Sequence, residues 1–106
     1  MTAEEVRALV LREIANRWDR SNAHGVNLRE CLLATPETRT YTCVGEAGAK
    51  NLVELWLVLE EDPAEHSGYE IVFDEVRHAF GLATQSTEGP VYLGIYGSFL
   101  DALEAM

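Results

Sequence analysis

Apolar residues are concentrated in a short run near the middle of the chain, Asn51 to Asp62, which reads NLVELWLVLEED. Seven of the eight residues from Leu52 to Leu59 are apolar. The run is too short to span a bilayer, and its Val and Trp side chains suit a pleated surface, so we predict a central β-strand. Because side chains alternate along a strand, one face should carry Val53, Leu55, Leu57 and Leu59, and the other Glu54, Trp56, Val58 and Glu60.

The N-terminal residues have a helical pattern instead. Thr2 and Glu5 have the T-x-x-E spacing of a capping box, which satisfies backbone donors where a helix begins. Apolar residues then recur at spacings of three and four, at Val6, Leu9, Val10, Ile14 and Trp18. We therefore predict a helix from about Ala3 to about Arg20.

Two strands, Leu28 to Ala34 and Arg39 to Val44, are expected between this helix and the central strand. The segment Thr35 to Thr38 would join them as a turn, with a proline at its second position. The apolar run that begins at Leu28 is equally compatible with a helical turn. The turn length decides whether Cys31 and Cys43 face each other, and the sequence leaves this open.

The remaining elements follow the central strand. Tyr69 to Phe73 and Ala79 to Thr84 predict a second hairpin, and Val91 to Tyr96 alternates with a period of two, as a strand does. Ser98 and Asp101 predict the start of a short final helix.

These elements predict an α+β, two-layer fold over residues 1–106 as a single domain. One long N-terminal helix would pack on a mostly antiparallel sheet of about five to six strands, followed by a short C-terminal helix. A single long helix covers one face of such a sheet, so the other face should stay partly open.

Composition limits the partners. The chain has 106 residues, 47% of them hydrophobic, and a net charge of −10. Residues 1–50 carry seven acids and seven bases, whereas residues 51–106 carry eleven acids and one base, Arg77. The negative electrostatic field of residues 51–106 argues against nucleic acid and anionic membranes as partners and favours a basic protein or peptide. No membrane span or secretory signal is visible, and two cysteines without C-x-x-C spacing suggest buried thiols, so we expect a cytoplasmic protein.

The open sheet face is the candidate binding surface. Alternation places an acidic and aromatic set there, in which the aromatic rings would be anchors and the carboxylates an electrostatic frame. The predicted binding residues are Trp56, Tyr92, Tyr96, Glu54, Glu60, Glu70 and Asp74. The bland alternative is that this set is simply the wetted face of a sheet.

Evidence for an enzyme is thin. Glu75 and His78 form a single E-x-x-H pair on a predicted turn, which falls short of a metal site, and no catalytic residue or cofactor is predicted. Cys31 could be a nucleophile beside a histidine, yet no spacing predicts that they meet. Glu13 on the helix could be a general base, although Arg17 four residues later favours its charged form.

The sequence therefore predicts a non-enzymatic interaction or regulatory module that binds a basic partner. A small enzyme or ligand-binding protein with a cleft beside the open face is the alternative. A homodimer formed through that face would bring like charges together, which argues against the homodimer. The choice between monomer and dimer stays open.

Overall fold

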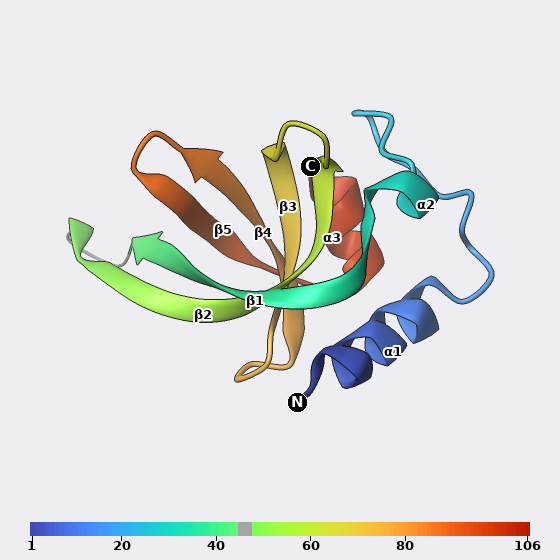
Figure 1. Cartoon of the computed structure of the whole chain (residues 1–106), viewed down its shortest axis with the longest axis horizontal. Coiled ribbons are helices and arrows are strands. Elements are labelled where there is room, and N and C mark those ends of the chain that lie inside the picture. Colours follow the sequence, from blue (N-terminus) through green and yellow to red (C-terminus); the bar gives the residue numbers. More distant parts are fainter. Residues whose placement is uncertain (45–47) are drawn as a thin grey trace.

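The computed structural model describes residues 1–44 and 48–106, in which five strands form a closed barrel with three helices outside it (Figure 1). The elements in chain order are α1 (Ala3–Ile14), α2 (Leu28–Cys31), β1 (Leu32–Val44), β2 (Lys50–Asp62), β3 (Ser67–Asp74), β4 (Ala79–Ser86), β5 (Gly89–Gly97) and α3 (Phe99–Ala105). No helix in these ranges is long and apolar enough to cross a bilayer.

Each strand pairs antiparallel with the next, and the barrel closes where β1 meets β5 in parallel. This closing seam consists of two residue pairs, Thr42 with Val91 and Cys43 with Tyr92. The predicted long helix on an open sheet is therefore wrong. The closure could not be predicted because it joins two strands far apart in the sequence through a very short contact.

Several predicted elements are confirmed. The central strand is β2, the second hairpin is β3 and β4, and the alternating segment lies in β5. Both expected capping boxes are present, one formed by Thr2 and Glu5 and one by Ser98 and Asp101.

The predicted first hairpin is wrong. Its first half is the short helix α2, the alternative that the sequence left open, and the rest is one continuous strand, β1. The β1–β2 register jumps from the Leu32–Leu59 pair to the Glu37–Leu57 pair, so four residues of β1 oppose a single residue of β2. Pro36 lies in this bulge, where its missing N–H breaks no ladder bond.

Helix α1 ends at Ile14, six residues before the predicted end. Ala15 has a positive φ of 53° with ψ of −114° and donates its N–H to the Leu11 carbonyl. No glycine occupies this position, so the usual signal for the end of a helix was missing there. Trp18 follows in the loop, where it packs against the core and lies 5.0 Å below the Arg29 guanidinium.

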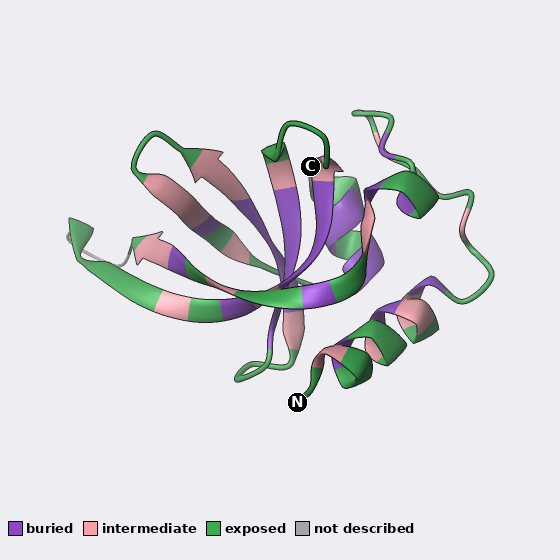
Figure 2. Cartoon of the chain, in the orientation of Figure 1, coloured by how far each residue is buried: buried purple, intermediate pink, exposed green. Residues whose placement is uncertain are grey.

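Buried residues form two layers, one on each side of the barrel wall. The outer layer packs α1 and α3 on the strands, and Figure 2 shows the buried bands of β2 and β3 beside α3. The second layer lies inside the barrel and consists of Tyr41, Leu55, Leu57, Val72, Ala83 and Tyr92.

A bulge in β2 decides which side chains enter the barrel. Leu57 pairs with Val72 and Leu59 with Ile71, so Val58 is an extra residue. Leu57 belongs to the inner layer, whereas Leu59 belongs to the outer layer. The expected alternation therefore fails after Leu57, because the extra residue turns Leu59 outward and the next residue, Glu60, inward.

Candidate functional site

Most of the predicted acidic and aromatic set shares one face, but that face is the inside of the barrel. Glu60, Glu70 and Asp74 are 3%, 1% and 1% exposed, and Tyr92 is 9% exposed. The structure therefore buries these four residues on the inner side of the barrel and not on an open face.

Both carboxylate oxygens of Glu70 accept hydrogen bonds. Its carboxylate accepts a hydrogen bond from the Tyr41 hydroxyl at 2.9 Å and another from the Gln85 amide at 2.9 Å. Burial raises the pKa of Tyr41 far above its ordinary value, and the Glu70 carboxylate raises it further. Because a buried carboxylate is costly without such partners, this cluster has a structural role.

The other two buried carboxylates are also paired. Glu60 lies 2.7 Å from His66 Nδ1 and 3.8 Å from the Arg39 guanidinium. Asp74 binds the Arg77 guanidinium at 3.0 Å and accepts the Arg77 backbone N–H at 3.1 Å. Arg77, the one base of residues 51–106, is thus engaged by an internal acid.

The remaining predicted residues lie outside the barrel. Trp56 is half-buried and packs against the outer core layer, opposite Phe73 on β3. Glu54 and Tyr96 are exposed. The structure therefore does not join these three to the four internal residues as one exposed surface.

A hollow of about 410 Å³ opens beside the closing seam, and we call it the seam hollow. It lies between the ends of β1 and β2 and the strand β5, with one residue from the β3–β4 turn. Its lining residues are Cys43, Val44, Asn51, Val53, Arg77, Tyr92, Leu93, Gly94 and Ile95.

Large apolar side chains are exposed in this hollow. Val44, Leu93 and Ile95 are 57%, 48% and 45% exposed. Leu52 and Tyr96, on the same strands, are also exposed. A hollow with an apolar lining and this much uncovered apolar surface is typical of a binding site.

Two bulges in β5 change the direction in which its exposed apolar side chains point. Ala83 pairs with Tyr92 and Leu82 with Gly94, so Leu93 has no opposing residue. Gly81 pairs with Ile95 and Phe80 with Gly97, so Tyr96 is a second extra residue. Bulges redirect side chains and are common beside functional sites. The simple alternation expected for β5 fails for this reason.

Tyr92 lies in the wall of the hollow with an unsatisfied hydroxyl. Within residues 1–44 and 48–106, its Oη is the buried side-chain polar atom that lacks a hydrogen-bond partner. Burial raises the pKa of Tyr92 to about 12, and the charge of Asp74 contributes to this rise. The ring lies over Gly81, where an added Cβ would stand 2.8 Å from Cε1 of Tyr92 and 2.3 Å from the Gly94 carbonyl.

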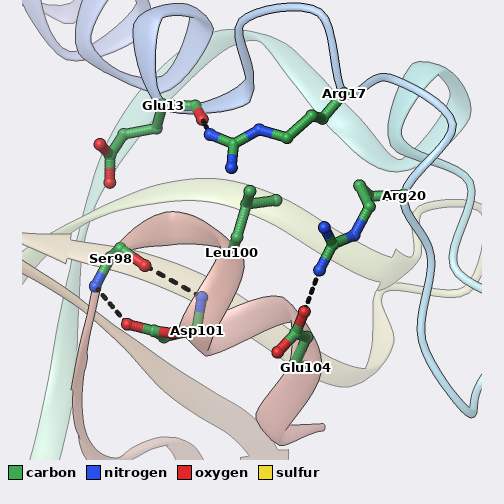
Figure 3. Close-up of a pocket in the computed structure, with 7 residues that line it drawn as sticks. All are labelled: Glu13, Arg17, Arg20, Ser98, Leu100, Asp101 and Glu104. Carbon is green, nitrogen blue, oxygen red and sulfur yellow. Dashed lines mark hydrogen bonds and ion pairs between the residues drawn. The ribbon is translucent and has the colours of Figure 1, made fainter.

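A second hollow lies between α1 and α3, and its polar groups already bind one another (Figure 3). Glu13, considered above as a general base, accepts the Phe99 backbone N–H at 3.1 Å. Arg17 donates to the Glu13 carbonyl rather than to its carboxylate, and Arg20 pairs with Glu104. The Glu13–Phe99 and Arg20–Glu104 contacts join α3 to the N-terminal segment.

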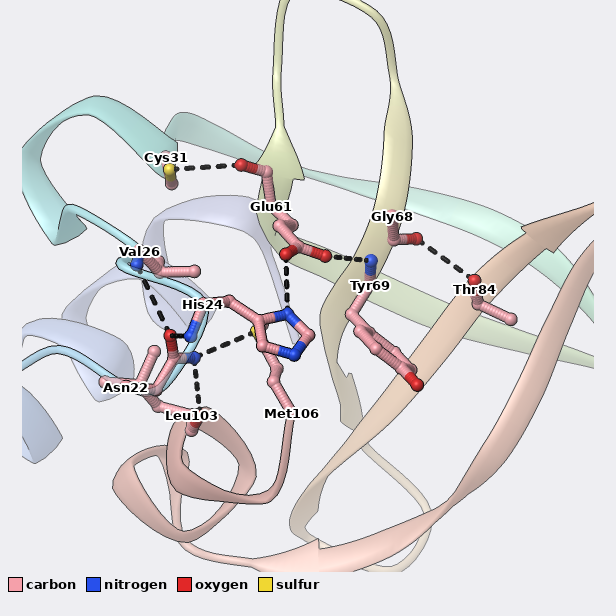
Figure 4. A network of polar contacts seen from close by, with 10 residues as sticks. All are labelled: Asn22, His24, Val26, Cys31, Glu61, Gly68, Tyr69, Thr84, Leu103 and Met106. Atoms are coloured by element: carbon pink, nitrogen blue, oxygen red, sulfur yellow. Dashed lines mark hydrogen bonds and ion pairs between the residues drawn. The ribbon is translucent and has the colours of Figure 1, made fainter.

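The groups considered for catalysis also have structural partners. Cys31 is buried, its Sγ donates to the Glu61 carbonyl at 3.5 Å, and burial raises the pKa of its thiol (Figure 4). His24 binds the Glu61 carboxylate at 2.6 Å. A buried thiol with a raised pKa is a poor nucleophile.

The Glu75–His78 pair is divided between two contacts. Glu75 binds the N-terminal ammonium at 2.5 Å, and His78 packs edge-on against Phe73. In the described ranges, no three His, Cys, Asp or Glu side chains are grouped as a metal site would require.

Comparison with known protein families, curated proteins and solved structures finds no significant match to this chain. The candidate site therefore rests on geometry. Sequence reasoning included Tyr92 but missed Val44, Val53, Leu93 and Ile95. One signal was available for the last two, because residues 89–97 contain no charged residue.

Proposed function

We propose that this protein is a non-enzymatic interaction module that binds a basic partner protein at the seam hollow. The observation that carries the proposal is the gathering of Val44, Leu93 and Ile95, all about half exposed, around one hollow. Burying such side chains against a partner removes apolar surface from water, which is the main source of favourable free energy in association.

The basic character of the partner is inferred from charge. The chain carries −10, and the internal acids Glu60, Glu70 and Asp74 are paired within the barrel. Exposed acids such as Glu54, on the same strand as Val53 of the hollow, are left to attract a basic surface. Association should therefore weaken as salt concentration rises.

The same charge disfavours a second copy as the partner, because two chains of −10 repel each other. The free thiols Cys31 and Cys43 support a reducing compartment, and we place the protein in the cytoplasm on this basis. Light scattering at low and high salt tests self-association, for which a dimer strengthened by salt would contradict the choice of partner.

The binding proposal is tested with a pair of matched variants. Ile95→Asp places a charge in the seam hollow, whereas Val76→Asp places one on the β3–β4 turn, where Val76 is 89% exposed and does not line the hollow. A partner captured by the wild-type protein and identified by mass spectrometry is titrated against both variants. We expect Ile95→Asp to weaken binding by about 2 kcal/mol or more and Val76→Asp to leave it nearly unchanged.

Circular dichroism confirms that both variants are folded before titration. Equal affinity of Ile95→Asp and wild type would show that the partner binds elsewhere, and would overturn the assignment of the seam hollow.

A further inference from the structure

The two edges of β5 are paired to very different extents. Its β4 edge is paired from the Ser86–Gly89 pair to the Phe80–Gly97 pair. On its other edge, the pairs with β1 involve Val91 and Tyr92 alone among the described residues. Residues 93–97 thus lie beside β4 on one side, and on the other side no described residue pairs with them.

This edge has bulges but lacks charged side chains. Strand edges in soluble proteins are commonly guarded by charged side chains, which repel a further strand. Residues 89–97 contain no charged residue, and three of their large side chains, Leu93, Ile95 and Tyr96, are nearly half exposed. The bulges at Leu93 and Tyr96 limit regular pairing to a short segment.

We propose that the partner binds by adding a short extended segment to the edge of β5 at residues 93–97, where no described residue pairs with it. Main-chain hydrogen bonds would hold the segment, and its alternate apolar side chains would enter the seam hollow beside Val44 and Val53. Its opposite face would carry Lys or Arg, as the charge of −10 favours. This inference rests on the proposed function and specifies the form of the partner.

The test uses a short synthetic peptide of alternating valine and lysine with blocked ends. Two further versions carry backbone N-methyl groups, one on every valine and the other on every lysine. A strand that adds to a sheet uses the N–H groups along one of its edges, and these belong to alternate residues. One methylation pattern should therefore weaken binding about tenfold or more, whereas the other should have little effect.

Binding is followed by amide NMR shifts, which should centre on residues 93–97 and on the hollow. Ile95→Asp should abolish the shifts, and Val76→Asp should retain them. If binding depends on Ile95 but both methylated peptides bind as well as the parent, strand addition is overturned and the interaction site stands. If the peptide does not bind and the captured partner is indifferent to Ile95→Asp, both proposals fail.

Discussion

The barrel interior contains two buried tyrosine hydroxyls in opposite circumstances. The Tyr41 hydroxyl donates to Glu70, whose other oxygen accepts from Gln85, so the hydroxyl and both carboxylate oxygens have partners. The Tyr92 hydroxyl has none among the residues that the structure describes, and it lies beside the seam hollow. The difference separates two uses of buried polarity. The hydrogen bonds at the Tyr41 end stabilise the barrel. At the Tyr92 end, the hydroxyl loses its hydrogen bonds to water on folding, and no new hydrogen bond offsets this desolvation cost.

The largest expected change in stability comes from adding a methyl group at Gly81, which the Tyr92 ring covers. Gly81→Ala would put a Cβ 2.3 Å from the Gly94 carbonyl and 2.8 Å from the Tyr92 ring, a contact that backbone and ring must move to relieve. We expect a loss of about 3 kcal/mol or more in the free energy of unfolding, measured by urea denaturation.

Gly25→Ala is the control for Gly81→Ala. Gly25 has φ of 72° and nothing within 4 Å of an added Cβ, so this substitution carries a conformational cost without a clash. That cost should be about 1 kcal/mol. Equal losses for the two variants would contradict the close packing of Tyr92 on Gly81.

A smaller loss is expected from Tyr41→Phe, which removes one donor from the buried Glu70 carboxylate. Hydrogen bonds to charged groups contribute about 1.5–3 kcal/mol, and we expect a loss of stability in this range. Tyr96→Phe, at an exposed position, should change the unfolding free energy by less than about 0.5 kcal/mol. A neutral Tyr41→Phe variant would show that the Glu70 cluster is not a stabilising feature.

Alkaline pH provides a third test. The pKa of Tyr92 is raised by burial from 10.0 to about 12, so its hydroxyl ionises in the unfolded chain before it ionises in the folded protein. The unfolded state therefore binds fewer protons than the folded state between these two values, and stability should fall as pH rises from about 10 to about 12. The pKa of Tyr41 is raised as well, which adds to the decline.

Each tyrosine's share of this decline is measured by denaturation at several pH values. Tyr41→Phe should flatten the decline more than Tyr92→Phe, because Tyr41 has the larger rise in pKa. The reverse order would mean that Tyr92, and not Tyr41, is the more strongly desolvated of the two.

No loss of stability should come from Tyr92→Phe at neutral pH. This change deletes a buried hydroxyl that has no partner in residues 1–44 and 48–106, and it keeps the ring over Gly81. The free energy of unfolding should stay unchanged or rise by up to about 1 kcal/mol. A marked loss of stability would show that the hydroxyl has a partner after all, and would remove the contrast with Tyr41.

Local patterns predicted several elements and both capping boxes correctly. β2 and β5 were recognisable because apolar runs and alternation depend on neighbours in the sequence. The closed barrel was not, because it depends on bulges at Val58, Leu93 and Tyr96 and on a seam between Thr42 and Val91. A bulge adds one residue to a strand, so every later side chain in that strand points to the opposite face. No residue type in these strands predicts where a bulge occurs.

The candidate site shows the same division. Parity correctly grouped Glu70, Asp74 and Tyr92 on one face, yet it could not show that the face is enclosed. Their partners Tyr41, Gln85 and Arg77 come from β1, β4 and the β3–β4 turn, so the pairing exists only after folding. From the sequence alone, Glu70 and Asp74 were predicted to be exposed and to bind another protein.

The two-pair seam also affects how the barrel moves. Thr42 and Val91 are nearly fifty positions apart in the chain, and bringing such distant segments together costs loop-closure entropy that two pairs offset only weakly. The seam should therefore open in local fluctuations that leave the helix-covered strands intact. Amide hydrogens of the seam residues would then exchange with solvent faster than those of β3. Such opening would widen the entrance beside Tyr92 and free more of the β5 edge.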